Sequence, residues 1–296
     1  MIITVVLVGI VLTMHGSLIE RLESDAAAQG PAVGATPHPT LNPPPSPTAT
    51  PSPTATPVNV RLQMAAVAAG LPAGSVSVAA LDLTSRRTFT YGTNAGQYTA
   101  SIVKVDILET LMLQAQDQGA PLSSDEQDQA SLMIEDSDDN AATDLWEDMG
   151  GAAALDAANQ TLGVSCTVPG DDDYWGLTTT CASGQVQILR QLEASSSPLD
   201  PASRSYIVTM MEDVLPSQRW GVPAAADAGT TFAVKDGWLN LQGDTDWVIN
   251  SDGIITYHGQ TLLVSTLSMS NTTEDSGISL DEKLAALAAE AVTVPG

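Results

Sequence analysis

The stretch Tyr98-Thr-Ala-Ser101-Ile-Val-Lys104-Val-Asp-Ile-Leu-Glu-Thr-Leu-Met-Leu113 carries the pattern around which the rest of the chain is interpreted. It predicts an apolar helix whose first turn holds Ser101 and Lys104, and a spacing of three places both side chains on one face. A serine hydroxyl becomes a good nucleophile when a neighbouring group takes its proton, and a lysine amine does so when its pKa is lowered by burial and positive charge. The helix N-terminus adds a positive field and free backbone N–H groups for an oxyanion. We therefore expect a nucleophilic Ser101 with Lys104 as its base.

A histidine base is the competing hypothesis, and few histidines are available for it. Of the 3 histidines, His15 and His38 lie in a leader and a linker, which leaves His258 for a Ser-His-Asp arrangement. His258 lies in a Tyr-His-Gly-Gln turn signal between two strand-like runs. The lysine base is the favoured interpretation.

The N-terminal part of the chain predicts export. Residues 2–14 form an apolar run that is shorter than the ~20 residues of a membrane-spanning helix and suits a signal-peptide core. We interpret residues 1–29 as a signal peptide or membrane anchor and residues 30–58, rich in Pro, Thr and Ser, as an extended spacer. Residues 59–296 are expected to form the folded domain, secreted or anchored at the cell envelope.

Composition limits the classes of partner. The formal net charge is −25, from 10 basic and 35 acidic residues, which disfavours nucleic acid and anionic membrane surfaces. Contact with a membrane is expected only through the N-terminal segment, and the domain is expected to be a monomer. No glycine-rich phosphate loop and no zinc-ligand spacing occurs, so we expect no cofactor and no metal. The acidic run 171–173 is interpreted as a solvated loop rather than as calcium ligands.

The two cysteines, Cys166 and Cys181, allow one disulfide in an oxidising compartment, while two buried thiols are the alternative. Because export is predicted, we expect the two cysteines to be joined.

Periodicity predicts an α+β domain. Terminal strands and terminal helices surround a helical middle, which implies a five-stranded antiparallel sheet built from both chain ends, flanking helices and a helical insertion. Asp252-Gly253 and His258-Gly259-Gln260 are expected to be hairpin turns. The expected helices are residues 61–69, 100–117, a helix opened by the capping box at 123–126, 141–149, 152–162, 182–192, 202–215 and 280–292, and the expected strands are 75–82, 88–91, 231–238, 247–251 and 260–269.

Three short motifs carry a family resemblance. They are Ser101-Ile-Val-Lys104, Ser137-Asp138-Asp139 and Lys235-Asp236-Gly237. In type and order they resemble the Ser-x-x-Lys, Ser-Asp-Asn and Lys-Thr-Gly signatures of the class A β-lactamase and penicillin-binding superfamily, across residues 59–293. The resemblance implies a β-lactamase/transpeptidase-like fold.

The resemblance also implies a role for each matching residue. Ser101 corresponds to the acylated nucleophile and Lys104 to its base. Ser137 corresponds to the hydroxyl that relays a proton to the leaving nitrogen, and Lys235 to the cation that tunes the relay. The backbone N–H groups of Ser101 and of Trp238, the residue after Gly237, would form the oxyanion hole.

The chain departs from the family pattern at three places. Asp139 stands where the family has an asparagine that holds the substrate amide, and Asn140 follows it as a candidate substitute. Asp236 replaces a threonine that helps to bind a substrate carboxylate, and an anion there is expected to repel that group. Between Leu162 and Thr180 there is no glutamate, whereas class A enzymes use one in that loop to activate the deacylating water. We therefore expect slow hydrolysis of any acyl-enzyme.

Two hypotheses about function follow. The first is an exported serine hydrolase acylated on Ser101 by a β-lactam, a cell-wall peptide or a small amide or ester. The second is a non-catalytic domain of the same fold that binds cell-wall material or a protein. Trp175, Trp238 and Trp247 are interpreted as core residues rather than as a binding groove.

Overall fold

The computed structural model describes residues 59–171, 174–241 and 246–293. The expected signal peptide or anchor and the expected spacer, residues 1–58, lie outside the described residues. The described residues all fall within one compact unit. None of the helices in the described ranges combines the length and apolarity that a membrane span requires.

A five-stranded antiparallel sheet forms the centre of the domain, as expected. Its order is β2-β1-β7-β6-β5, so the first strand of the chain pairs with the last. The sheet is thus built from strands at both ends of the domain. Its strands are β1 (Val76–Asp82), β2 (Thr88–Gly92), β5 (Ala233–Asn240), β6 (Trp247–Tyr257) and β7 (Gln260–Asn271).

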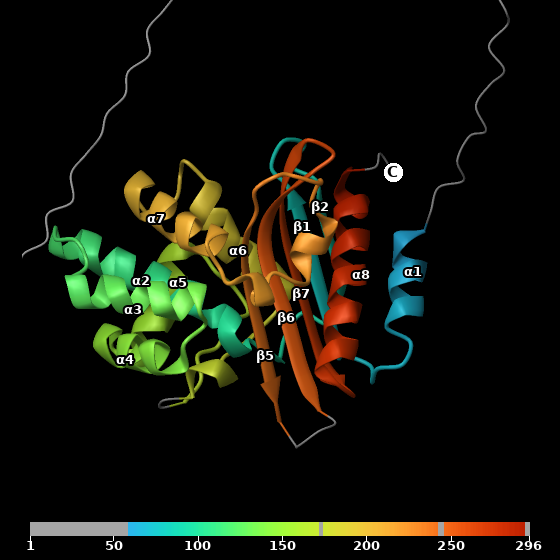
Figure 1. The fold of residues 1–296 in the computed structure, drawn as a ribbon, viewed down its shortest axis with the longest axis horizontal. Coiled ribbons are helices and arrows are strands. Elements are labelled where there is room, and N and C mark those ends of the chain that lie inside the picture. Colours follow the sequence, from blue (N-terminus) through green and yellow to red (C-terminus); the bar gives the residue numbers. More distant parts are fainter. Residues whose placement is uncertain (1–58, 172–173, 242–245, 294–296) are drawn as a thin grey trace, which may run out of the picture. The chain divides into compact units, whose positions relative to one another are not determined.

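The terminal helices α1 (Val60–Val67) and α8 (Glu274–Thr293) lie together on one face of the sheet, as Figure 1 shows. The apolar side chains of α8, such as Leu284 and Val292, are fully buried with Met64 of α1. Burial of apolar area is the dominant favourable term in folding, so the packing of α8 covers and stabilises this face of the sheet.

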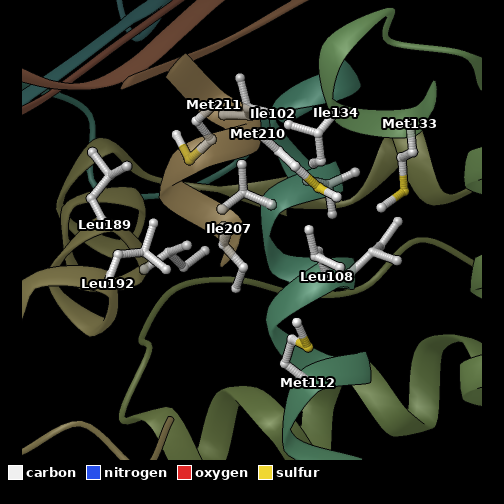
Figure 2. Packing of buried hydrophobic residues seen from close by; sticks show 14 of the residues in the cluster. Ile102, Leu108, Met112, Met133, Ile134, Leu189, Leu192, Ile207, Met210 and Met211 are labelled. Carbon is white, nitrogen blue, oxygen red and sulfur yellow. The ribbon is translucent and has the colours of Figure 1, made fainter. Parts of the chain in front are cut away.

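The helical insertion lies on the other side of the sheet (Figure 1) and surrounds the helix that follows Ser101. That helix, α2, has ten successive buried residues from Val103 to Met112. Its apolar side chains, Leu108 and Met112 among them, pack with Ile207 in Figure 2. The helices are α2 (Val103–Gln118), α3 (Ser124–Glu135), α4 (Asp139–Met149), α5 (Gly151–Leu162), α6 (Ala182–Glu193) and α7 (Pro201–Glu212).

The expected turn at Asp252-Gly253 is wrong. Both residues lie inside β6, where Asp252 pairs with Lys235 on one side and Ser265 on the other. A Cβ at Gly253 would lie 2.9 Å from a Val222 side-chain carbon. The glycine therefore permits close packing and not a turn. The other expected turn is confirmed: His258 and Gly259 join β6 to β7 with positive φ values of 49° and 72°, as a two-residue hairpin requires.

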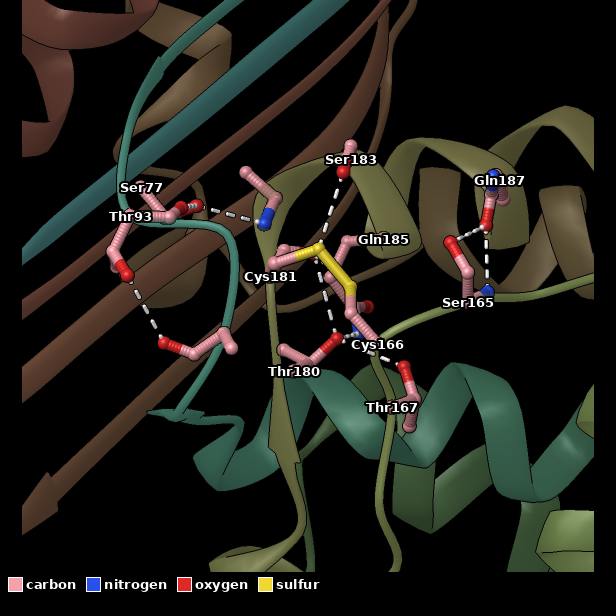
Figure 3. Close-up of a disulfide and its surroundings, with 12 residues drawn as sticks. Ser77, Thr93, Ser165, Cys166, Thr167, Thr180, Cys181, Ser183, Gln185 and Gln187 are labelled. Atoms are coloured by element: carbon pink, nitrogen blue, oxygen red, sulfur yellow. Dashed lines mark hydrogen bonds between the residues drawn. A yellow bond between two sulfur atoms is a disulfide. The ribbon is translucent and has the colours of Figure 1, made fainter.

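Cys166 and Cys181 form the expected disulfide, with 5.9 Å between their Cα atoms (Figure 3). Cys181 directly follows the short strand β4 (Thr179–Thr180), which pairs with β3 (Gln97–Tyr98) just before the nucleophile. The disulfide therefore closes the loop that borders Ser101.

Replacement of both cysteines by alanine should lower the free energy of unfolding by about 3 kcal/mol, because closing a loop of 15 residues restricts the unfolded chain by about that amount. Urea unfolding under non-reducing conditions measures the difference. A reductant should destabilise the wild type and leave the double variant unchanged. Free thiols titrating in the non-reduced wild type would contradict the assignment.

Two carboxyl groups are buried on α2, and we expect them to make the free energy of unfolding depend on pH. Burial raises the pKa of Asp106 to about 7 from 3.8, against a hydrogen bond from Asn159, and it raises the pKa of Glu109 as well. The folded state therefore binds more protons than the unfolded state between about pH 4 and pH 7. The stability that these two groups contribute is fully present below their pKa in the unfolded chain, and it is lost as the pH rises through their pKa in the folded protein.

Asp106→Asn should remove much of this loss. At pH 8 the free energy of unfolding of the variant should exceed that of the wild type by up to about 4 kcal/mol, whereas at pH 4 the two should differ little. Urea unfolding at both pH values measures the change. Asp117→Asn, at an exposed position of the same helix, is the matched control and should be neutral. An equal increase in the free energy of unfolding at both pH values would show that the titration of Asp106 is not the cause.

Candidate active site

Ser101, the expected nucleophile, lies in a backbone segment that is held by hydrogen bonds from β6. Ser101 belongs to the 3₁₀ turn η1 (Ala100–Ile102), is 9% exposed, and follows Ala100, whose φ of 47° is unusual for a residue with a Cβ. The Asn250 amide of β6 donates to the carbonyls of Tyr98 (2.8 Å) and Thr99 (2.9 Å). These bonds hold the strained turn in place.

The edge strand β5 lies directly against the backbone of the Ser101 segment. A Cβ at Gly237 would lie 2.8 Å from the backbone nitrogen of Ser101 and 2.9 Å from the Thr99 carbonyl oxygen. Only a glycine allows the strand to come this close. Trp238, the second expected oxyanion-hole residue, is the next residue of the same strand and is half-buried.

Lys104 is fully buried, one helical turn beyond Ser101. Its Nζ lies 2.7 Å from Asp139 Oδ1, 2.8 Å from the Ser137 carbonyl oxygen and 3.2 Å from Ser137 Oγ. Three acceptors match the three N–H donors of an ammonium group. Within the described residues, none of the Lys104 hydrogen bonds goes to Ser101. Desolvation lowers the pKa of Lys104, and the Asp139 carboxylate opposes that shift.

Ser137 connects the helical insertion to the sheet. Its Oγ accepts hydrogen bonds from Lys104 and, at 3.0 Å, from Lys235 Nζ. Because both oxygen lone pairs are then occupied, the hydroxyl proton is left to donate elsewhere. Ser137 has a positive φ of 57°, and the next residue, Asp138, caps α4 by accepting from the Ala141 N–H at 2.8 Å.

Lys235 is also fully buried, on β5. Desolvation, followed by repulsion from Lys104, lowers its pKa to about 7, while Asp236 and Asp139 oppose the shift. The structure thus brings three residues expected to be catalytic, Lys104, Ser137 and Lys235, into one hydrogen-bonded group beside Ser101.

Trp175 belongs to the buried core, as expected, and also contacts this group. It is 9% exposed, and Lys104 Nζ lies 4.8 Å from its ring centroid. Its Nε1 donates to Thr143 Oγ1 at 3.1 Å, and the Thr143 hydroxyl donates to the Asp139 carbonyl. An aromatic ring therefore faces Lys104 in the loop where the family pattern has a glutamate. Trp247, assigned to the core together with Trp175, is half-buried on β6.

Asp236 does not lie where its sequence position suggested. Its side chain is fully buried and its Oδ2 accepts from the Trp220 N–H at 3.2 Å. In the sheet it pairs with Ser251, which pairs with Thr266, and Thr266 bonds to Asp281 of α8. Asp236 therefore faces α8.

Desolvation raises the pKa of Asp236 well above its usual value, which favours the neutral form. The expected repulsion of a substrate carboxylate by Asp236 is wrong, because its side chain is fully buried on the face of the sheet that packs against α8.

The remaining candidates lie apart from the hydrogen-bonded group or at its edge. Asn140 is exposed next to Asp139, and His258 lies in the β6–β7 turn and not at Ser101. In the described ranges no three His, Cys, Asp or Glu side chains are close enough to hold a metal ion. A hollow of about 670 Å³ lies at the opposite end of α2, bordered by Met112 and Tyr206, and contains none of the reactive residues.

Gly237→Ala should lower the free energy of unfolding by about 1 to 3 kcal/mol, because the new Cβ forces β5 and the Ser101 segment apart. Gly70→Ala is the control, since a Cβ there meets nothing within 4 Å. Urea unfolding compares both variants with the wild type. A Gly237→Ala variant as stable as Gly70→Ala would show that the strand is free to move away.

Comparison with known proteins agrees with this architecture. The model of the Beta-lactamase enzyme family matches residues 112–292, more than half of the chain. LppW of Mycobacterium tuberculosis and of Mycobacterium bovis, named as a lipoprotein, is 27% identical over 201 residues. The match covers 66% of this chain and 63% of the relatives, so it spans less than two thirds of their length.

Solved structures show the same fold. A β-lactamase from Chitinophaga pinensis has a TM-score of 0.70 and 17% identity, covering 79% of this chain and 99% of that chain. A class A β-lactamase from Mycobacterium abscessus has a TM-score of 0.66 and 17% identity, and the match covers 79% of this chain and 100% of that chain. PBP-A has a TM-score of 0.67 and 20% identity, and the match covers 79% of this chain and 95% of that chain. With the family model, the sheet and the helical insertion in agreement, the chain belongs to the β-lactamase enzyme family.

Proposed function

We propose that the domain is an exported serine hydrolase that is acylated on Ser101. The observation that carries the proposal is the convergence of Lys104 and Lys235 on the hydroxyl of Ser137, where Lys104 lies one helical turn after Ser101 and Lys235 lies on the strand that packs against the Ser101 backbone. Burying two lysine side chains around one hydroxyl costs free energy, and such arrangements of buried ionisable groups are found most often at functional sites. The substrate class we propose is a β-lactam, a cell-wall peptide or a small amide or ester.

Acylation would proceed by attack of Ser101 Oγ on a carbonyl carbon. The proton of Ser101 goes to Lys104, which must first be in its neutral form. As the carbonyl–leaving-group bond breaks, the Ser137 hydroxyl gives its proton to the leaving nitrogen or oxygen and takes one back from the Lys104 ammonium, which restores both groups. The backbone N–H groups of Ser101 and Trp238 would stabilise the oxyanion. Water then cleaves the acyl–Ser101 bond, which releases the acid and restores the serine.

Deacylation is expected to be slow. Trp175 faces Lys104, and an indole offers no acceptor to activate a water molecule. An acyl-enzyme that persists is the outcome we propose for penicillins. A variant of the structural relative PBP-A has been solved as an acyl-enzyme complex with penicillin G, which makes penicillin a suitable probe for this chain.

The second candidate function is a non-catalytic domain that binds cell-wall material or a protein. One observation favours it: the three hydrogen bonds of Lys104 end on Ser137 and Asp139, which suits a protonated lysine better than a base. A base needs a free lone pair at the moment of attack.

We also propose an extracytoplasmic location, at the cell envelope or outside it. The Cys166–Cys181 disulfide suits an oxidising compartment, and the relative LppW is named as a lipoprotein. The Pro-rich spacer proposed for residues 30–58 would then hold the domain away from the surface.

Mass spectrometry after incubation with a fluorophosphonate or penicillin G tests the proposal. We expect one covalent adduct, located on Ser101, and loss of labelling by at least 100-fold in Lys104→Ala with the fold retained. Lys283→Ala removes the third lysine, exposed on α8, and should label like the wild type. If neither reagent labels the wild type, the binding-domain function takes the place of the hydrolase.

A further inference from the structure

Asp139 offers an unused oxygen at the reactive group. Its Oδ1 is bound to Lys104 Nζ at 2.7 Å, yet its side chain is 76% exposed. Within the described residues, no hydrogen bond reaches its second oxygen, Oδ2. A carboxylate oxygen is an acceptor only, so a ligand group that meets it favourably must be a hydrogen-bond donor.

The cations of the site are closed to a ligand, whereas this anion is open. Lys104 and Lys235 have no exposed surface, and their N–H groups are directed to Ser137, Asp139 and the Asp236 carbonyl. A ligand arriving from solvent therefore meets the negative charge of Asp139 before either lysine. The excess of acidic residues over the whole chain has the same sign and draws cations in.

Trp175 helps to hold the Asp139 backbone in place and is not itself open to a ligand. Its ring is 9% exposed, and Lys104 Nζ lies over the ring at 4.8 Å from the centroid. Its indole N–H donates to the Thr143 hydroxyl, which donates to the Asp139 carbonyl. The group that a substrate can reach is therefore the exposed Asp139 carboxylate, whose Oδ2 is an acceptor for an ammonium N–H.

We propose that Asp139 makes this site selective for substrates that carry a protonated amine close to the carbonyl attacked by Ser101, such as amino-acyl esters and amides, and that it disfavours substrates with a carboxylate there. This inference rests on the proposed function. Asp139 acts as the specificity-determining residue: the substrate ammonium donates to Oδ2, while Oδ1 keeps Lys104 in place. The acylation and hydrolysis steps are those given above.

The test compares three esters of one fluorogenic alcohol, 4-methylumbelliferone, that differ in the charge of the acyl group. The 3-aminopropanoate is cationic, the butanoate is neutral and the succinate half-ester is anionic. For the wild type we expect kcat/KM to fall in that order, with at least a 10-fold ratio of cation to anion at low salt. The ratio should shrink as salt is added.

Asp139→Asn keeps the size of the side chain and removes its charge. We expect the cation-to-anion ratio to fall at least 10-fold in this variant, whatever happens to its absolute rates. Asp148→Asn removes the same charge from an exposed position of α4 and should leave the ratio within twofold of the wild type.

The outcomes separate this inference from the proposed function. If fluorophosphonate labels Ser101 but the neutral or anionic ester is preferred by the wild type, the inference is wrong and the hydrolase stands. The same conclusion follows if Asp139→Asn leaves the ratio unchanged. If Ser101 is not labelled and no ester is hydrolysed, the hydrolase fails and the inference fails with it. The salt dependence of the wild-type ratio needs no variant and tests the charge argument by itself.

Discussion

Two buried lysines share one hydroxyl oxygen, and the rest of the site depends on that arrangement. Lys104 and Lys235 both donate to Ser137 Oγ, so two positive charges lie close together without solvent. Desolvation and mutual repulsion should drive protons off the pair, and the pKa of Lys235 falls to about 7. Asp139 offsets part of this cost. A lysine whose pKa is lowered in this way suits the proton relay that we propose between Ser101 and a leaving group.

The topology of the sheet makes this arrangement possible. Ser101 follows the N-terminal strands, Ser137 lies in the helical insertion and Lys235 lies on the C-terminal edge strand. They lie in one region because β7 pairs with β1 and carries β6 and β5 next to the Ser101 segment. Asn250 then ties β6 to the backbone just before Ser101. The order of the strands thus places the C-terminal strands β5 and β6 next to the short turn that contains Ser101.

Local patterns predicted the parts of the site that depend on local spacing. Ser101 and Lys104 share a helical turn, and the capping box of α3 forms as expected. Asn250 and Trp175 gave no such signal, because their contacts join residues far apart in sequence. The error at Asp236 has a different cause: neighbouring residues of a strand face opposite sides of the sheet, so a carboxylate next to the inward-facing Lys235 had to point toward α8. Asp252-Gly253 was misread because a glycine selected for packing resembles a turn signal.

The charges of the described residues are distributed in a way that points to function at Lys104. The structure has a large excess of carboxylates, yet among the described residues it forms a single ion pair, Lys104 with Asp139. Buried carboxyls such as Asp106 and Asp281 are instead held toward their neutral forms by desolvation, which raises their pKa. Lys104 is fully buried while Asp139 is largely exposed, so the carboxylate offsets the desolvation of the lysine and at the same time remains open to solvent. The pair therefore joins the buried group of Lys104, Ser137 and Lys235 to the surface of the protein.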